Sequence, residues 1–385
     1  MNIAIIKGES SYGTLRCLAD EICREALILG HSTMVCDFLG KSDYQSDQIA
    51  HSLIHGNFDL IITFNGMLSE VALKSGENVL DASGAVVIVF MVDDPTYHYP
   101  RLIVPIKKRI FLCPNSSHLK YLDSIKVPNR KSLMLCGAEK HGDTIVDFKS
   151  REKRAVVAMS WMGYPQPFWD KIDDSYLNQL IGDTVSTLLK QDEPRPFEVF
   201  ERCCQHLAEI KNFELIPDEY ISFILANIVT YVRQYNRIQL ISKIKKSDIP
   251  LTLVGHGWDL VCQGANNIRL LPELSCSNLK NVYRESRVVI NVNASNGGCE
   301  RAFMAAINGA AVLSEFNAKY AQHSTRDTEV TFYDLQSESD VVDKLGILLE
   351  SAEGERRADL GRENCISTHL WRHRIEEIIG LAKEI

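Results

Sequence analysis

The fold is decided by the stretch RVVINVNASNGGCERAFMAAINGAAVLSEFN at residues 287–317. Its first apolar run, VVINV, predicts a buried strand, and a polar turn containing Gly297 and Gly298 leads from it into a helix that starts near Glu300. Gly309 ends this helix, and a second apolar run then predicts another strand. The segment is therefore typical of a strand–helix–strand unit in a parallel sheet.

The same alternation of short apolar runs and helical periods fills the first 150 residues. Several runs, such as LIITF, VVIVFMV and RIFLC, are apolar almost throughout, which favours strands covered on both faces. Turn residues such as Asn65-Gly66 and Asp93-Asp94-Pro95 follow the runs. Strands are predicted at 2–7, 33–38, 59–64, 85–92, 109–113 and 132–136. We expect a doubly wound parallel sheet with its ligand crevice at the carboxyl ends of the strands.

A second domain is predicted after a charged break near residue 151. Its strands are expected at 151–163, 250–254, 267–271, 287–292, 311–314 and, more weakly, 330–333. Helical periodicity replaces strands between 165 and 248, which indicates a helical insertion. The chain ends in two predicted helices, at 337–351 and 364–383. The expected domains are 1–150, 151–363 including the insertion at 165–248, and a closing helix at 364–385.

The composition argues against nucleic acid or an anionic membrane as the main partner. The 385 residues include 42 Lys and Arg against 50 Asp and Glu, a formal net charge of −8 that disfavours polyanions. No apolar run approaches the roughly 20 residues of a membrane-spanning helix, and the sequence does not start with a signal-peptide pattern. We expect a cytoplasmic protein.

The eleven cysteines do not follow a metal-binding or disulfide pattern. They are scattered, and no CxxC occurs. Cys203, Cys204 and His206 supply too few ligands for a metal site, so a partly buried helix face is the expected environment of this group.

The turn before Glu300 is a candidate phosphate site. Glycines at a helix start let backbone N–H groups approach a phosphate, and the helix dipole favours negative charge there. Arg301, in the first helical turn, would add a bidentate donor to a diphosphate. The alternative is an ordinary loop followed by a surface arginine, and the local spacing does not decide between the two.

The order of several motifs resembles the GT-B glycosyltransferases, most closely the CgeB-like (glycosyl transferases group 1) branch. In residues 287–317 the pattern is a strand, Asn-x-Asn, glycine, then Arg-x-Phe-x-x-Ala-x-x-Gly-Ala. LVGHGW at 253–258, LPEL at 271–274 with the YRES step that ends at 286, and THLWRHR at 368–374 follow the family's order. FMVDDPTY at 90–97 resembles its D-D-P strand end. The resemblance covers most of the chain except residues 165–248.

This resemblance implies two Rossmann-like domains and a sugar transfer from a nucleotide-diphosphate sugar, with UDP the most prevalent carrier. The acceptor would be a glycan, a protein or a small molecule, and neither a metal nor another cofactor is expected. The implied nucleotide-sugar-binding residues are His256, Asn293, Gly297, Gly298, Arg301, Phe303 and Gly309. His256 could instead simply cap the end of a strand.

The chain departs from the family at Met304. The family usually has a glutamate at this position, which binds the ribose hydroxyls, and a thioether cannot accept those hydrogen bonds equally well. Glu300 or Glu315 could substitute, or the nucleotide could be held differently.

An inverting transfer needs a base that removes the proton of the acceptor hydroxyl. Glu9 follows the first predicted strand, and Asp93 and Asp94 follow the fourth, so all three are candidates at the carboxyl edge of the first sheet. The two aspartates could also serve only as turn formers before Pro95. His98 is a further candidate.

Two other kinds of function remain open from the sequence. One is a sugar-nucleotide epimerase or a phosphorylase on the same fold, and the other is a degenerate GT-B protein that only binds. Release of a nucleoside diphosphate separates sugar transfer from both phosphorolysis and pure binding. The insertion at 165–248 could form an acceptor groove, an oligomer contact or a partner surface.

Overall fold

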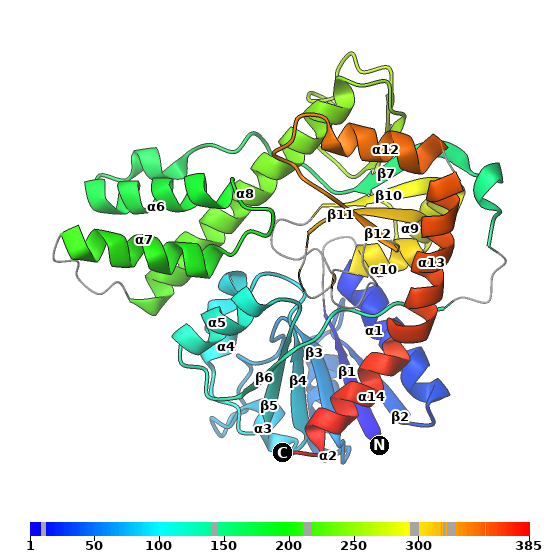
Figure 1. Cartoon of the computed structure of the whole chain (residues 1–385). Helices are drawn as coiled ribbons and strands as arrows, with labels where there is room; N and C mark the ends of the chain where they lie inside the picture. Colours follow the sequence, from blue (N-terminus) through cyan, green and yellow to red (C-terminus); the bar gives the residue numbers. More distant parts are fainter. Residues whose placement is uncertain are drawn as a thin grey trace. The chain divides into compact units, whose positions relative to one another are not determined.

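The computed structural model describes residues 1–8, 13–140, 145–210, 217–292, 300–316, 318, 321, 329–350 and 352–385. These residues form two compact units, here called unit 1 (Met1–Glu139 with His369–Ile385) and unit 2 (Lys140–Thr368). Each unit contains one six-stranded sheet in which neighbouring strands run parallel (Figure 1). The predicted α/β fold with two parallel sheets is confirmed.

The sheet of unit 1 has the strand order β2-β1-β3-β4-β5-β6. Its strands are β1 (Asn2–Lys7), β2 (Ser32–Asp37), β3 (Leu60–Phe64), β4 (Val86–Phe90), β5 (Arg109–Cys113) and β6 (Arg130–Leu133). Every residue of β3 and β5 is buried. This burial on both faces explains why the apolar runs are nearly continuous, because helices cover each side of a parallel sheet.

Short helices and one long one connect the strands of unit 1. They are α1 (Thr14–Ile28), α2 (Asp43–His55), α3 (Val79–Ala82), η2 (Pro95–His98), α4 (Tyr99–Ile103) and α5 (Ser116–Ser124). Helix α2 begins with a capping box, in which Ser42 Oγ accepts the Gln45 N–H and the Gln45 side chain accepts the Ser42 N–H. Such a box satisfies two of the backbone donors that a helix start leaves open.

Residues 369–385 complete unit 1 from the far end of the sequence. The Ala138 N–H donates to the His369 carbonyl at 2.8 Å, and the Trp371 N–H donates to the Ala138 carbonyl at 3.0 Å. Helix α14 (Trp371–Ala382) then packs against α1 (Figure 1). There the buried Trp371 indole N–H donates to the Glu21 carboxylate at 2.9 Å.

The single helix predicted at 364–383 is wrong in one respect, because the structure has two helices there. Helix α13 (Ala352–Thr368) belongs to unit 2, and α14 belongs to unit 1. Leu370 separates them in an extended conformation, with φ −74° and ψ 152°, and forms a parallel bridge with Ala138. The backbone therefore exchanges helical hydrogen bonds for a strand-like pairing at this point.

The sheet of unit 2 has the strand order β12-β11-β10-β7-β8-β9. Its strands are β7 (Glu152–Ala158), β8 (Leu251–Val254), β9 (Ile268–Leu271), β10 (Ser286–Asn291), β11 (Ala311–Glu315) and β12 (Val330–Tyr333). Its other elements are η3 (Phe148–Ser150), α9 (Cys276–Glu285), α10 (Glu300–Ile307) and α12 (Asp340–Glu350). Val157, Leu253, Ile290 and Leu313, from four adjacent strands, lie in one buried cluster.

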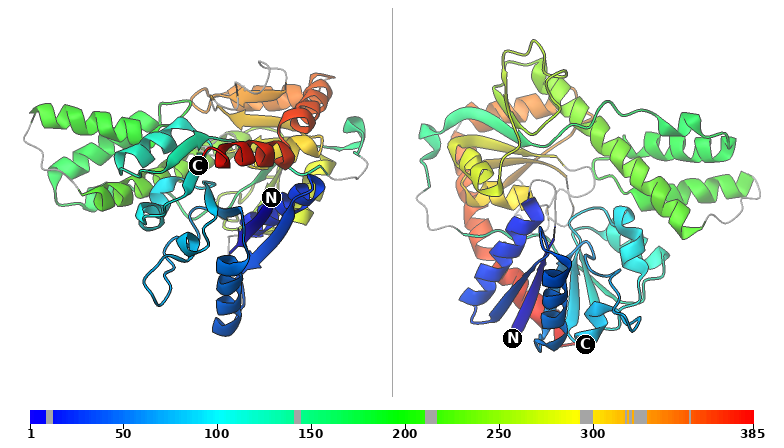
Figure 2. Two further views of the ribbon diagram at one scale, coloured as in Figure 1. Left: turned by 90° about the horizontal axis from the view of Figure 1, so that it is seen from below. Right: turned by 180° about the vertical axis from the view of Figure 1, so that it is seen from behind.

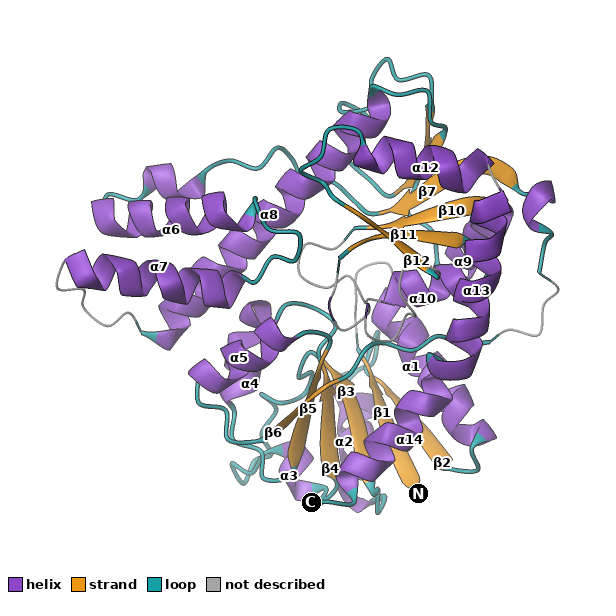
Figure 3. Cartoon of the chain, in the orientation of Figure 1, coloured by secondary structure: helices purple, strands orange, loops and turns teal. Residues whose placement is uncertain are grey.

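The predicted helical insertion is present within unit 2. It contains η4 (Phe168–Lys171), α6 (Ser175–Leu188), α7 (Pro196–Ile210) and α8 (Asp218–Lys245). Figure 2 shows α6 and α7 standing away from the sheet of their own unit, and Figure 3 shows no strand between them. The second half of α8 packs on that sheet, since Leu240, Ile241 and Ile244 belong to its buried cluster. None of the described helices is both long and apolar enough to cross a membrane.

Candidate functional site

Arg301 lies across the carboxyl ends of two neighbouring strands in unit 2. Its Nη1 donates to the Ala158 carbonyl, at the end of β7, at 2.8 Å, and its Nη2 donates to the Val292 carbonyl, just after β10, at 3.3 Å. Only 19% of the side chain is exposed. The guanidinium is therefore held in place at the strand ends, where open α/β sheets bind their ligands.

Polar side chains extend this edge across β10, β11 and β12. The Asn291 amide donates to the Ser314 hydroxyl at 3.0 Å, and both side chains are fully buried. Glu315 and Tyr333 are register partners at the ends of β11 and β12, and both are buried. Burial raises the pKa of the Tyr333 hydroxyl well above its usual range, and the Glu315 carboxylate raises it further, while the charge of Arg301 opposes the shift.

A buried carboxylate, phenol and amide thus share one sheet edge with a fixed guanidinium. Buried polar groups are costly unless they are hydrogen-bonded, so their concentration at a single edge indicates a prepared site for a polar ligand. Arg301 and Glu315 are candidates from the sequence, whereas Tyr333 and Asn291 emerge only from the structure. The polar Asn291 and Ser314 interrupt otherwise apolar strands, and these interruptions were the available signal.

Four of the predicted site residues lie outside the described part of the chain. They are Glu9, Asn293, Gly297 and Gly298. Their roles stay predictions. The helix that follows the two glycines does begin at Glu300, as the sequence predicts.

Two residues predicted to contact the nucleotide sugar, Phe303 and Gly309, stabilise the fold. Phe303 is a buried side chain, and Gly309 ends a helix. Phe303 is 1% exposed and its neighbour Met304 is 6% exposed, so both side chains are buried. Gly309 has φ 77° and donates to the Ala306 carbonyl at 2.8 Å, while Ala310 donates to the Ala305 carbonyl at 3.1 Å. These two bonds form a Schellman motif that ends α10.

His256 lies in a tight loop after β8. It is 54% exposed, its Nδ1 pairs with the Glu273 carboxylate, and its backbone N–H donates to Ser160 Oγ at 3.3 Å. Gly255 and Gly257 flank it with φ 141° and 85°, and a Cβ on either would lie 2.3 Å from a backbone carbonyl oxygen. The glycines are therefore required for close packing of two loops at the ends of β7 and β8.

In unit 1, Asp93 sits in a polar arrangement at the ends of β3 and β4. Its carboxylate is 47% exposed, accepts a hydrogen bond from the Asn65 amide at 2.7 Å, and lies 3.6 Å from His98 Nε2. From the sequence, Asn65-Gly66 after a buried strand predicts only a turn, and the structure adds the contact of Asn65 with Asp93.

Asp94 has the opposite environment, with only 4% of its side chain exposed. It caps η2 by accepting from the Thr96 backbone N–H at 3.1 Å and the Thr96 hydroxyl at 2.7 Å, and it lies 3.5 Å from the buried His118 Nε2. Burial raises the pKa of the Asp94 carboxyl, but the partners His118 and Thr96 outweigh burial and leave this pKa below its usual value.

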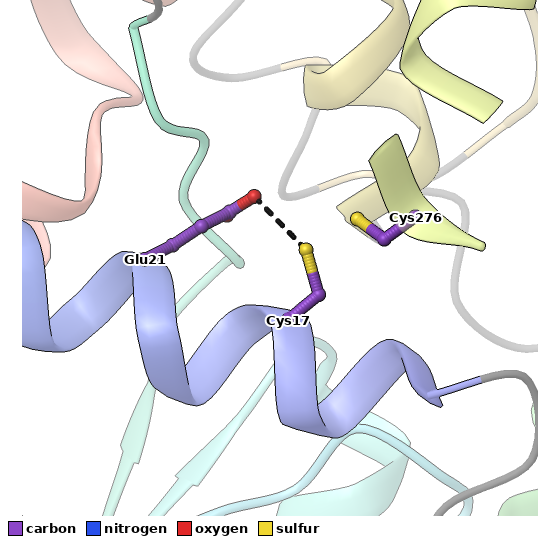
Figure 4. Close-up of side chains that lie close together, drawn as sticks. All are labelled: Cys17, Glu21 and Cys276. Atoms are coloured by element: carbon purple, nitrogen blue, oxygen red, sulfur yellow. Dashed lines mark hydrogen bonds between the residues drawn. The ribbon is translucent and has the colours of Figure 1, made fainter. Parts of the chain in front are cut away.

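Two of the described cysteines lie on α1 and make polar contacts, Cys17 with Glu21 and Cys23 with Thr33. Cys17 Sγ lies 3.5 Å from Glu21 Oε1, one helical turn away on the same helix (Figure 4). On α7, Cys203 and Cys204 are partly buried free thiols. Burial raises the pKa of Cys204 to about 12, so this thiol stays protonated at neutral pH.

Known proteins resemble the chain at two levels. Residues 233–380 match a family model described as glycosyl transferase-like. A sucrose-phosphate synthase from Thermosynechococcus elongatus is similar over 100% of this chain and 98% of its own, with 10% identity and a TM-score of 0.58. No curated protein matches the chain.

Two further solved structures match over 100% of both chains. An alpha-glucosyltransferase in complex with UDP has 10% identity and a TM-score of 0.59. Anabaena Alr3699/HepE in complex with UDP and glucose has 8% identity and a TM-score of 0.52. At such low identity the likeness to these structures establishes the fold alone. The chain therefore has the GT-B fold, and its residues 233–380 are similar to the glycosyl transferase-like family.

Proposed function

We propose that this protein is a glycosyltransferase that takes its sugar from a nucleoside-diphosphate sugar and transfers it to an acceptor hydroxyl. The observation that carries the donor class is Arg301, fixed at the carboxyl ends of β7 and β10. A planar guanidinium suits a diphosphate, because it offers parallel N–H donors and a permanent positive charge. UDP-sugars are the first candidates, since two solved proteins of this fold are complexes with UDP.

The same group supplies the chemistry that the leaving diphosphate needs. As the bond from the anomeric carbon to the diphosphate oxygen breaks, negative charge grows on that oxygen, and fixed donors nearby lower the barrier. Arg301 and the N-terminus of α10 would provide these donors, together with Gly297 and Gly298 if the predicted turn holds the phosphates. We propose that the reaction needs no bound metal or other cofactor.

We propose that unit 1 supplies the base that takes the proton of the acceptor hydroxyl, and Asp93 is the first candidate for this base. Its carboxylate is half-exposed, whereas that of Asp94 is buried and occupied as a helix cap. Glu9 remains a second candidate. The acceptor O–H bond breaks, its proton passes to the carboxylate, and the oxygen's electron pair forms the new bond to the anomeric carbon.

The test starts with the donor. Binding of UDP, GDP, ADP and CDP is measured by calorimetry on wild type and on Arg301→Ala, Arg301→Lys and Arg356→Ala. Loss of a charged donor costs about 1.5–3 kcal/mol, so Arg301→Ala is expected to weaken the best ligand about 10–150-fold. Arg301→Lys keeps the charge but loses the planar fork, and it should bind with intermediate affinity.

Arg356 is the matched control, because it is an exposed arginine of the same unit and forms an ion pair with Glu353. Arg356→Ala is expected to bind like wild type. Equal affinity in wild type and Arg301→Ala would remove Arg301 from the site. Release of nucleoside diphosphate from a sugar donor, unchanged by EDTA, supports transfer without a metal. Binding without any release would instead support the degenerate, binding-only alternative, which the absence of a carboxylate at Met304 favours.

A further inference from the structure

Asn65, at the carboxyl edge of the sheet of unit 1, has an unusual backbone conformation. It follows β3 with φ 50°, in the left-handed region, and is 2% exposed. Its backbone N–H donates to the Phe90 carbonyl at the end of β4, at 3.0 Å. A non-glycine residue in this conformation costs free energy, and such residues persist where the surroundings fix them.

Both the oxygen and the nitrogen of the Asn65 side-chain amide form hydrogen bonds. Its Oδ1 accepts the backbone N–H groups of Val92 at 2.9 Å and Asp93 at 3.1 Å, while its Nδ2 donates to Asp93 Oδ2 at 2.7 Å. Backbone N–H groups can only donate, so the amide oxygen must face them and the NH₂ group must face the carboxylate. The orientation of this amide is therefore fixed by chemistry.

His98 borders the same carboxylate oxygen from η2. Its Nε2 lies 3.6 Å from Asp93 Oδ2 and makes no hydrogen bond to the described residues. The Asp94 side chain caps the helix that carries His98. Asp93 Oδ2 thus lies between an amide donor and an imidazole, on a backbone that β3 and β4 hold together.

We propose that Asn65 is a positioning residue for the acid–base step, holding the Asp93 carboxylate in one orientation beside His98. This inference rests on the proposed function, in which Asp93 takes the acceptor proton. A charge-assisted bond at 2.7 Å limits rotation of the carboxylate. Fixing a base in advance matters because small misplacements of a reacting group are costly in rate.

Two substitutions separate positioning from a merely structural role. Asn65→Gly accepts the positive φ but removes every side-chain bond. Asn65→Asp retains an oxygen acceptor for the two backbone N–H groups and tolerates the conformation, but it loses the NH₂ donor and places a second carboxylate against Asp93. The control is Asn57→Gly, because Asn57 is an exposed asparagine of unit 1 with φ 49°.

The assay measures the release of nucleoside diphosphate with water or glucose as the acceptor. The donors are UDP-glucose, UDP-galactose, GDP-mannose and ADP-glucose. UDP affinity and melting temperature are measured on the same variants. We expect kcat to fall about 10²-fold in both Asn65→Gly and Asn65→Asp, with UDP affinity unchanged and Asn57→Gly equal to wild type. Asn65→Asp with wild-type kcat would overturn the proposal, since the donor bond to Asp93 is lost there, and so would wild-type kcat in a folded Asn65→Gly. If wild type and Asn57→Gly release no nucleoside diphosphate from any donor, the proposed function itself fails and the positioning role falls with it.

Discussion

Asp93 and Asp94 are neighbours in sequence whose carboxylates face different surroundings. The first is 47% exposed and bonded to Asn65, and the second is 4% exposed and bonded to Thr96. The D-D-P motif cannot distinguish them, because alternation along an irregular turn depends on backbone angles that composition does not specify. The structure does distinguish the two aspartates, so mutating each one separately tests a different role.

Asp93→Asn is expected to lower turnover about 10²–10⁴-fold with little change in melting temperature, because a base acts mainly in the transition state. Asp94→Asn is expected to lower stability while leaving the turnover per folded molecule nearly unchanged. It should lower the free energy of unfolding by about 1–3 kcal/mol, since it weakens a buried charge-assisted pairing with His118. Steady-state kinetics and urea unfolding of both variants check this, and equal losses of turnover per folded molecule would contradict it.

The acid dependence of Asp94 has a defined sign. Its pKa in the folded protein is below the ordinary 3.8, so the ionised form stabilises the fold above pH 3.8, and this contribution is lost as the pH falls through the lower folded value. Asp94→Asn should therefore unfold with a weaker dependence on pH in this acid range than wild type. Parallel acid titrations of the two proteins measure the difference.

The burial of Met304 favours a role for this position in the protein interior over a contact with the nucleotide. Met304 is 6% exposed, and α10 is buried on every side over the whole stretch from Ala302 to Ile307. Met304→Glu should therefore reduce the free energy of unfolding by more than about 2 kcal/mol, because a carboxylate would lose its hydration in the core. Met304→Leu is the volume-matched control. A stable Met304→Glu protein with tighter UDP binding would show instead that this position faces the nucleotide.

At the scale of elements, the predicted strands were placed within one to three residues of the observed ones in most cases. Continuous apolar runs bounded by turn residues carry this information locally, as in β3, predicted at 59–64 and observed at Leu60–Phe64. The break between α13 and α14 was missed, because it depends on a backbone pairing of Leu370 with Ala138 that no local pattern encodes. The CgeB-like assignment and the cytoplasmic location stay predictions.

Helix α10 depends on how it ends. Gly309 has φ 77°, and a Cβ there would lie 2.5 Å from Arg151 Nη2. Gly309→Ala should therefore destabilise the protein by about 1–3 kcal/mol through strain and displacement of the arginine. Gly346 in α12 is the matched control, because a Cβ there meets nothing within 4 Å.

Gly346→Ala should stabilise the protein by about 0.5–1 kcal/mol, since alanine favours a helix over glycine. Chemical unfolding of both variants measures the two effects. Equal signs for the two changes would contradict the assigned role of Gly309.

At the scale of the whole molecule, the chain runs through unit 1, forms all of unit 2, and returns to unit 1. Trp371 anchors the return, since it is fully buried and donates to Glu21. Trp371→Phe keeps most of the apolar volume but leaves a buried carboxylate oxygen without this donor, so unit 1 should lose about 1–3 kcal/mol. Hydrogen exchange resolved by peptide should show faster exchange in β1, α1 and α14, and faster exchange confined to unit 2 would be the contrary result.

This return path also governs the order in which a ribosome can finish the protein. A growing chain emerges from its amino end, so strands β1–β6 are available long before the helix that covers α1 has been made. Unit 2 holds residues 140–368 in one continuous piece, so its fold needs no segment from outside that range. Unit 1, although its first strand is synthesised earliest, must wait for residues 369–385, and until then the face of α1 with Glu21 stays open to chaperones and proteases.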